Sequence, residues 1–177
     1  DDSNNVSGMG TLACGAITST ADTATFTSTN ADDPLVVIKN TASDATGARL
    51  RFIKDKGAAG AANDVAGLIE FYADDASQDQ VLFSEIKSQV AVHTNGQEGG
   101  KLTLSVASHD GESQPGLIIT DGSVEDEVDV TIGNGAASLT TIAGTSQFNG
   151  NQPSMISIEG ANSNSNRIKQ FKWISIL

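Results

Sequence analysis

Short alternations of apolar and polar residues, separated by turn residues, dominate the chain from residue 35 to residue 121. In the clearest of them, Leu102, Leu104 and Val106 alternate with two polar residues. A two-residue period places the three apolar side chains on one face of a strand. The same period recurs in two further segments, residues 49–52 and 67–73. The pattern therefore predicts an all-β module of short antiparallel strands.

The alternations and the turn residues between them give a list of expected elements. We expect strands at residues 35–38, 48–54, 65–73, 80–92, 99–108 and 116–121, with one more leading to Ile132. A turn is expected at Asp74–Asp79, between two expected strands. Turns are also expected at Thr94–Gly96 and Gln114–Gly116, because Gly, Asn and Pro supply the backbone angles that turns need. For residues 81–90 an amphipathic helix competes, since Leu82, Ile86 and Val90 are four residues apart. A strand is preferred, because Val81 and Phe83 would then be buried too.

The chain divides into three parts by composition. Residues 1–34 predict an extended segment rich in Thr and Gly, residues 35–133 a β-sandwich-like module, and residues 134–177 a linker with the start of a second, incomplete module. The second module is inferred from an internal repeat. A Thr-containing stretch that ends at Phe26 is followed by Pro34 and Arg49, and the same order of residues returns at Phe148, Pro153 and Arg167. Such a restart is typical of tandem arrays, so we expect the chain to belong to a longer protein.

The composition favours thin layers over one thick core. Apolar residues are 38% of the chain, aromatic residues only 5%, and there are 18 glycines. We therefore expect part of the apolar surface to be buried against other copies of the chain, with extended or β-helical flanks beside the module. The residues expected in the core or the assembly contacts are Phe26, Leu35, Val37, Leu50, Phe52, Ile69, Phe71, Leu102, Leu104, Ile118 and Phe148.

The net charge of −12 argues against partners that are themselves acidic. Nucleic acid needs Lys or Arg to replace its counterions, and an anionic membrane surface needs the same residues. No apolar run approaches the ~20 residues of a membrane span. Cys14 is the single cysteine and cannot form a disulfide within the chain, so it is interpreted as a small buried side chain.

Acidic groups are the one concentrated chemistry. Three acidic groups could offer oxygens to Ca²⁺: Asp32–Asp33, Asp74–Asp75 and Glu125–Asp129. Because they lack a known calcium-loop spacing, they are interpreted as solvated surface. A glycosidase needs two carboxylates across a sugar, which aromatic residues usually support, and Trp173 and Tyr72 are the only Trp and Tyr. We therefore expect a protein that is not an enzyme and that has no metal or other cofactor.

Four motifs of the chain resemble modules of bacteriophage tail fibres, especially those of marine phages. They are Asp33–Asn40, Gly67–Phe71, Glu98–Leu104 and Gly116–Ile119. The resemblance implies a trimeric, elongated and virion-borne structural protein, outside the cell, that binds other tail proteins. It also implies a host glycan or protein receptor at the distal end of the fibre, although this chain has no obvious receptor-binding head.

Two alternatives to a fibre spacer remain open. A cell-surface adhesin repeat would bind glycan or protein through the loops expected at Asn95–Gly100 and Gln114–Gly116. A tailspike segment would shorten a polysaccharide and would lose that activity when a specific pair of Asp or Glu residues is changed.

Overall fold

A computed structural model describes residue 17, residues 19–20 and residues 23–145 of the chain. The chain divides into two compact units, Asp1–Phe52 and Ile53–Leu177. Each unit is described below by itself. Most of the predicted second module, with Phe148 and Trp173, lies outside the described residues, as does Cys14.

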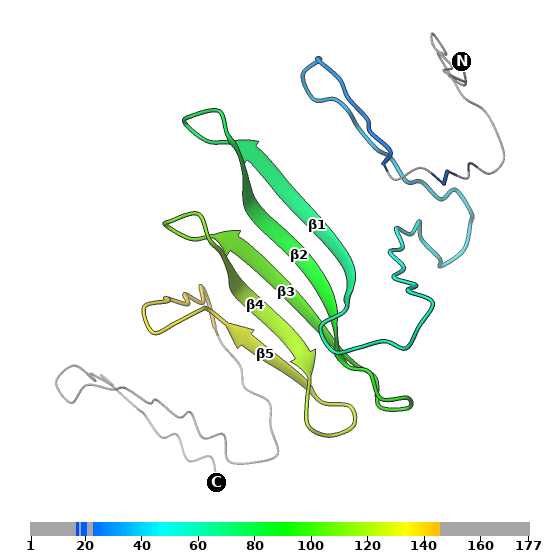
Figure 1. Cartoon of the computed structure of the whole chain (residues 1–177), viewed down its shortest axis with the longest axis vertical. Helices are drawn as coiled ribbons and strands as arrows, with labels where there is room; N and C mark the ends of the chain where they lie inside the picture. Colours follow the sequence, from blue (N-terminus) through cyan, green and yellow to red (C-terminus); the bar gives the residue numbers. More distant parts are fainter. Residues whose placement is uncertain (1–16, 18, 21–22, 146–177) are drawn as a thin grey trace. The chain divides into compact units, whose positions relative to one another are not determined.

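The second unit contains one antiparallel sheet of five strands (Figure 1). The strands are β1 (Val65–Asp74), β2 (Gln80–Val92), β3 (Gly99–Ala107), β4 (Ser113–Asp121) and β5 (Val128–Ile132). They lie side by side in the order of the chain, β1-β2-β3-β4-β5, so each strand pairs with the next through a tight connection. The described residues contain no helix. The prediction of an all-β chain is confirmed, and the competing helix at residues 81–90 is wrong because these residues lie in β2.

The register of the strands gathers apolar side chains on one face of the sheet. Ile69 pairs with Ile86, Ile86 with Leu104, Leu104 with Leu117, and Leu117 with Ile132. Paired residues of neighbouring strands point to the same face, so this row of five crosses the whole sheet. We define the apolar face by Ile69, Phe71, Ile86, Leu102, Leu104, Val106, Leu117, Ile119, Val128, Val130 and Ile132.

The opposite face, here the polar face, carries hydroxyl, amide and charged side chains in its middle. Glu85 pairs with Ser105, and Lys87 pairs with Thr103. Glu85, Thr103 and Ser105 are the buried residues of the described chain, whereas no hydrophobic residue among the described ones is buried. The single sheet thus lacks a hydrophobic core of its own.

Two of the predicted turns are confirmed. Between β1 and β2, the Oδ1 atom of Asp75 accepts hydrogen bonds from the backbone N–H groups of Ser77 at 2.7 Å and Asp79 at 3.0 Å. Between β2 and β3, the N–H of Gln97 donates to the carbonyl of Thr94 at 2.9 Å. Gly96 there has a φ of 79°, which glycine adopts without steric cost.

The third predicted turn, Gln114–Gly116, is wrong. These residues lie in β4, where Pro115 pairs with Ser105 and the register shifts at Gly116. Pro115 is tolerated because β5 pairs with β4 only from Leu117 onward, so no strand needs an N–H from the proline on that side. The chain instead reverses at residues 108–112, where Gly111 has a φ of 86° and its N–H bonds to the carbonyl of Ser108.

Two segments predicted as strands are not strands in the structure. Residues 35–38 form a wholly apolar run and residues 48–54 contain an apolar-polar alternation, but neither segment pairs with a strand. Strand propensity alone does not form a strand, because the backbone groups need a partner with a matching register. One local contact in the first unit joins Asp44 to Thr46. Asp44 accepts from the N–H of Thr46 at 2.9 Å and from its hydroxyl at 2.6 Å, and these bonds lower the pKa of Asp44.

Candidate assembly surface

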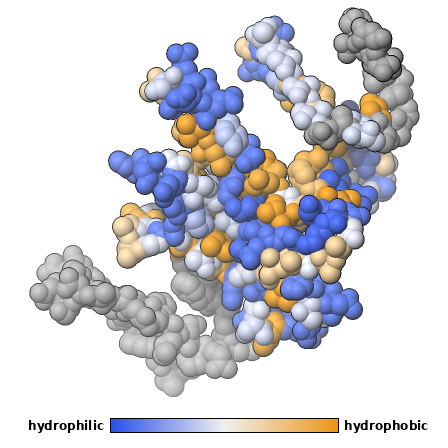
Figure 2. Space-filling model, in the orientation of Figure 1, coloured by the Kyte–Doolittle hydropathy of each residue, from blue (hydrophilic) through white to orange (hydrophobic). Residues whose placement is uncertain are grey.

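The apolar face is the most prominent surface of the second unit. Its residues are partly open to solvent on every strand: Ile69 and Leu104 are each 37% exposed, Phe71 49%, Val106 57% and Ile132 58%. Figure 2 shows apolar surface open to solvent between polar patches. Large exposed apolar patches are uncommon on monomeric soluble proteins, so this face is the candidate for an assembly surface.

The structure brings together four of the residues predicted for core or assembly contacts. Ile69, Phe71, Leu102 and Leu104 share the apolar face. Ile118 lies on the polar face instead, because it pairs with Thr103.

The remaining predicted residues fall elsewhere. Five of them belong to the first unit and are each at least half exposed: Phe26, Leu35, Val37, Leu50 and Phe52. Phe148 lies outside the described residues.

Several members of the apolar face are not among the residues predicted for core or assembly contacts. They are Ile86, Val106, Leu117, Ile119, Val128, Val130 and Ile132. The alternation of residues 128–132 was a signal for the last three. For Ile86 and Leu117 the signal was non-local, because only the cross-strand register aligns them with Leu104.

A small charged cluster occupies the polar face. The ammonium of Lys87 lies 2.9 Å from Oε1 of Glu85, and the hydroxyl of Ser113 lies 3.5 Å from the same oxygen. The hydrogen bond from Lys87 is the main cause that lowers the pKa of Glu85, with smaller contributions from Ser105 and Ser113. Glu70 pairs directly with Glu85 across β1 and β2, so two carboxylates face each other there.

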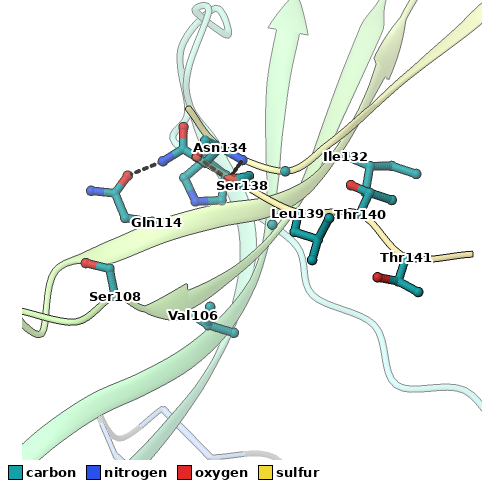
Figure 3. Close-up of a pocket in the computed structure, with 12 residues that line it drawn as sticks. Val106, Ser108, Gln114, Ile132, Asn134, Ser138, Leu139, Thr140 and Thr141 are labelled. Carbon is teal, nitrogen blue, oxygen red and sulfur yellow. Dashed lines mark hydrogen bonds between the residues drawn. The ribbon is translucent and has the colours of Figure 1, made fainter. Parts of the chain in front are cut away.

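A pocket of about 560 Å³ lies at the end of the apolar face, beside the segment that follows β5 (Figure 3). Val106 and Ile132 line it from the sheet, and Leu139 lines it from the segment. The Nδ2 group of Asn134 donates to Oε1 of Gln114 at 2.6 Å and fixes the start of the segment. The residues lining the pocket include no titratable side chain, so the pocket offers hydroxyls, amides and apolar surface but no acid or base.

The loops that join β2 to β3 and β4 to β5 form an acidic hollow of about 760 Å³. One of its carboxylates, that of Glu127, accepts hydrogen bonds from the N–H groups of Ser123 at 2.6 Å and Val124 at 3.2 Å. These bonds lower the pKa of Glu127 and hold the loop. Among the described residues, no group of three or more His, Cys, Asp or Glu side chains is arranged to hold a metal ion.

The comparisons with known proteins add no relative. Neither a protein-family model, nor a curated protein, nor a solved structure matches the chain. In the part of the chain that the structure describes, no helix is long and apolar enough to cross a membrane. The resemblance to tail-fibre modules stays a prediction that rests on the four sequence motifs.

Proposed function

We propose that this chain is a structural module of a phage tail fibre, and that three copies associate through the apolar face. One observation carries the assembly: a sheet with one apolar face and no buried hydrophobic residue in the described part of the chain. A sheet with one apolar face is stable when that face is buried against a second layer.

The free energy of covering the face favours assembly. A Val, Leu, Ile or Phe side chain contributes about 1.5–3 kcal/mol when it passes from full exposure to full burial. The residues of the apolar face start from partial exposure, so each contributes a fraction of that value. Summed over eleven such residues per copy, the gain is enough to link folding to association.

Three copies give a specific architecture for the fibre. Three sheets with their apolar faces turned to a common axis form a three-sided prism. The sandwich-like layers expected within one chain would then form between chains, and the acidic loops and polar face would point to water. A closed threefold arrangement does not extend sideways without limit, unlike open head-to-tail contacts.

The biological role comes from the resemblance of the four motifs to tail-fibre modules. In that role the chain is a stiff extracellular spacer of the virion, joined to other tail proteins. It supports host attachment by holding a receptor-binding tip away from the virion, and it performs no catalysis itself.

The proposal is tested by solution mass and by one matched pair of substitutions. Light scattering of the purified chain is expected to give three times the chain mass. Ile132→Asp places a charge on the apolar face, whereas Thr131→Asp adds the same charge on the polar face of the same strand. We expect Ile132→Asp to yield monomers and Thr131→Asp to remain trimeric.

Leu104→Asp provides a second test in the middle of the face and should also dissolve the trimer. Circular dichroism checks that each variant keeps its β-structure. A wild-type chain that is monomeric at micromolar concentration, or a folded Ile132→Asp variant that stays trimeric, would contradict the proposal.

A further inference from the structure

The charges of the chain are strongly separated along the sequence. Residues 39–56 contain five of its ten basic residues and two acidic ones, a net charge of +3. Residues 57–145, which include the whole sheet, contain two lysines and fourteen acidic residues, a net charge of −12. A basic segment without a strand partner therefore precedes an acidic sheet.

The basic segment has the pattern of a strand that faces two environments. From Arg49 to Lys54 the order is Arg, Leu, Arg, Phe, Ile, Lys, so Leu50 and Phe52 alternate with Arg49 and Arg51. Leu50 is 64% exposed and Phe52 51% exposed. The segment matches a sheet edge that has an apolar and an acidic side.

The outer edge of β1 offers these two sides. β1 is the first strand in the sheet order, so its outer backbone groups have no neighbouring strand in the described chain. Ile69 and Phe71 point to the apolar face, and Glu70 points to the polar face beside Glu85. The carboxylates of Glu70 and Glu85 pair across the two strands and repel each other. The ion pair of Lys87 in this cluster is with Glu85. A cation beside Glu70 would balance the second charge.

We propose that residues 49–53 of one copy add as a sixth, antiparallel strand to the outer edge of β1 in a second copy. This inference rests on the proposed assembly of copies. In the register that places Arg51 beside Glu70, Phe52 pairs with Ile69 and Leu50 with Phe71 on the apolar face. On the polar face, Arg49 pairs with Tyr72 and Ile53 with Leu68. All five pairs match in character, the Arg49 guanidinium lying beside an aromatic ring.

The opposite edge of the sheet is a poorer partner for β1. β5 carries Asp129 on the polar face and no basic side chain, so β5 of one copy would bring no positive charge to Glu70 of the next in any register. The basic segment brings Arg51 to the same position. Charge therefore favours exchange of residues 49–53 over direct joining of two sheets.

Charge reversal tests the register. Arg51→Glu places a third carboxylate beside Glu70 and is expected to weaken association about tenfold per contact. The exchange Arg51→Glu with Glu70→Arg restores the pair and should recover the wild-type association. Lys54→Glu is the matched control, because it makes the same change in charge but lies beside Gly67 in this register. Equal effects of Arg51→Glu and Lys54→Glu, or no recovery in the exchanged pair, would overturn the proposal.

Cysteine cross-linking tests whether the contact joins two chains. In a Cys14→Ser background, Arg49→Cys and Tyr72→Cys are made in separate chains, which are then co-expressed and oxidised. Paired positions of neighbouring strands are close enough for a disulfide, so a two-chain band is expected from the mixture and from neither variant alone. Lys54→Cys mixed with Tyr72→Cys is out of register and should give none.

The outcomes separate this inference from the proposed function. A trimer by light scattering without the two-chain band overturns the strand exchange and leaves the apolar-face assembly standing. A disulfide within one chain carrying both Arg49→Cys and Tyr72→Cys, with no two-chain band from the mixture, shows pairing inside the chain and also overturns it. A monomeric wild-type chain contradicts both.

Discussion

At the residue scale, Glu85 shows how a charged side chain is kept on a sheet with no hydrophobic core. It is 8% exposed and bonds to Lys87, two residues along the same strand. Residues two apart on a strand share a face, so this pair is set by local sequence once β2 forms. The bonds from Ser105 and Ser113 depend on β3 and β4 lying beside it. The lowered pKa of Glu85 therefore depends in part on the pairing of β2 with β3 and of β3 with β4.

We predict that Glu85→Gln lowers the free energy of unfolding at pH 7 by about 1 kcal/mol, the scale of a partly exposed ion pair. The folded pKa of Glu85 lies below its ordinary value of 4.5, so the charged form is favoured in the folded state. The contribution is present above that ordinary value and is lost as the pH falls through the folded pKa. Urea unfolding of both proteins from pH 7 to pH 3 should show the difference shrinking below about pH 4.5.

Glu125→Gln is the control for this prediction, because Glu125 lies in the exposed loop before β5. It removes one carboxylate without touching the cluster, and its effect on stability should be small at every pH. A difference between wild type and Glu85→Gln that stays constant down to pH 3 would contradict the role of the charge.

At the element scale, two neighbouring glycines at the start of β3 differ in the space around them. A Cβ at Gly99 would overlap the side-chain carboxylate of Asp121, which would have to move, whereas a Cβ at Gly100 would meet nothing within 4 Å. The two neighbours thus have opposite roles at the start of β3. Gly99 leaves room for the end of β4, while Gly100 only adds flexibility to the unfolded chain.

We predict that Gly99→Ala destabilises the sheet by about 1 kcal/mol, because Asp121 must move, and that Gly100→Ala is neutral or stabilising by about 0.5 kcal/mol. Thermal unfolding of the two variants measures the contrast. Amide exchange should locate the loss in Gly99→Ala at the ends of β3 and β4. Equal effects of the two substitutions would show that the approach of Asp121 to Gly99 does not limit stability.

At the scale of the whole molecule, stability and association are expected to be one process. The described chain buries three polar residues and no hydrophobic one, so burial of apolar side chains contributes little to the stability of the isolated sheet. Three or more strands with a hydrophobic face gain stability when that face is covered. The net charge of −12 opposes close approach of copies, so the apolar face and complementary ion pairs must outweigh it.

We predict that the midpoint of thermal unfolding rises with protein concentration, because association stabilises the folded state by mass action. A hundredfold increase in concentration should raise the midpoint by several degrees in differential scanning calorimetry. The Ile132→Asp variant should unfold at a lower temperature that does not depend on concentration. A wild-type midpoint that is independent of concentration would contradict linked folding and association.

The sequence by itself determined the local features of this protein. The positions of β1, β2, β3 and β5, and the shared face of Leu102, Leu104 and Val106, follow from a two-residue period that each strand carries within itself. The turns predicted at Asp74–Asp79 and Thr94–Gly96 follow from local residues, because Asp75 bonds to its own sequence neighbours and Gly96 supplies the positive φ.

Only the tertiary structure decided which segments find a partner. Gln114–Gly116 has the chemistry of a turn but lies in β4, while residues 48–54 have the alternation of a strand but pair with none. The row from Ile69 to Ile132 is likewise invisible in any one segment. The physical reason is that strand pairing and register join residues far apart along the chain, so local propensity allows a strand but does not supply its neighbour.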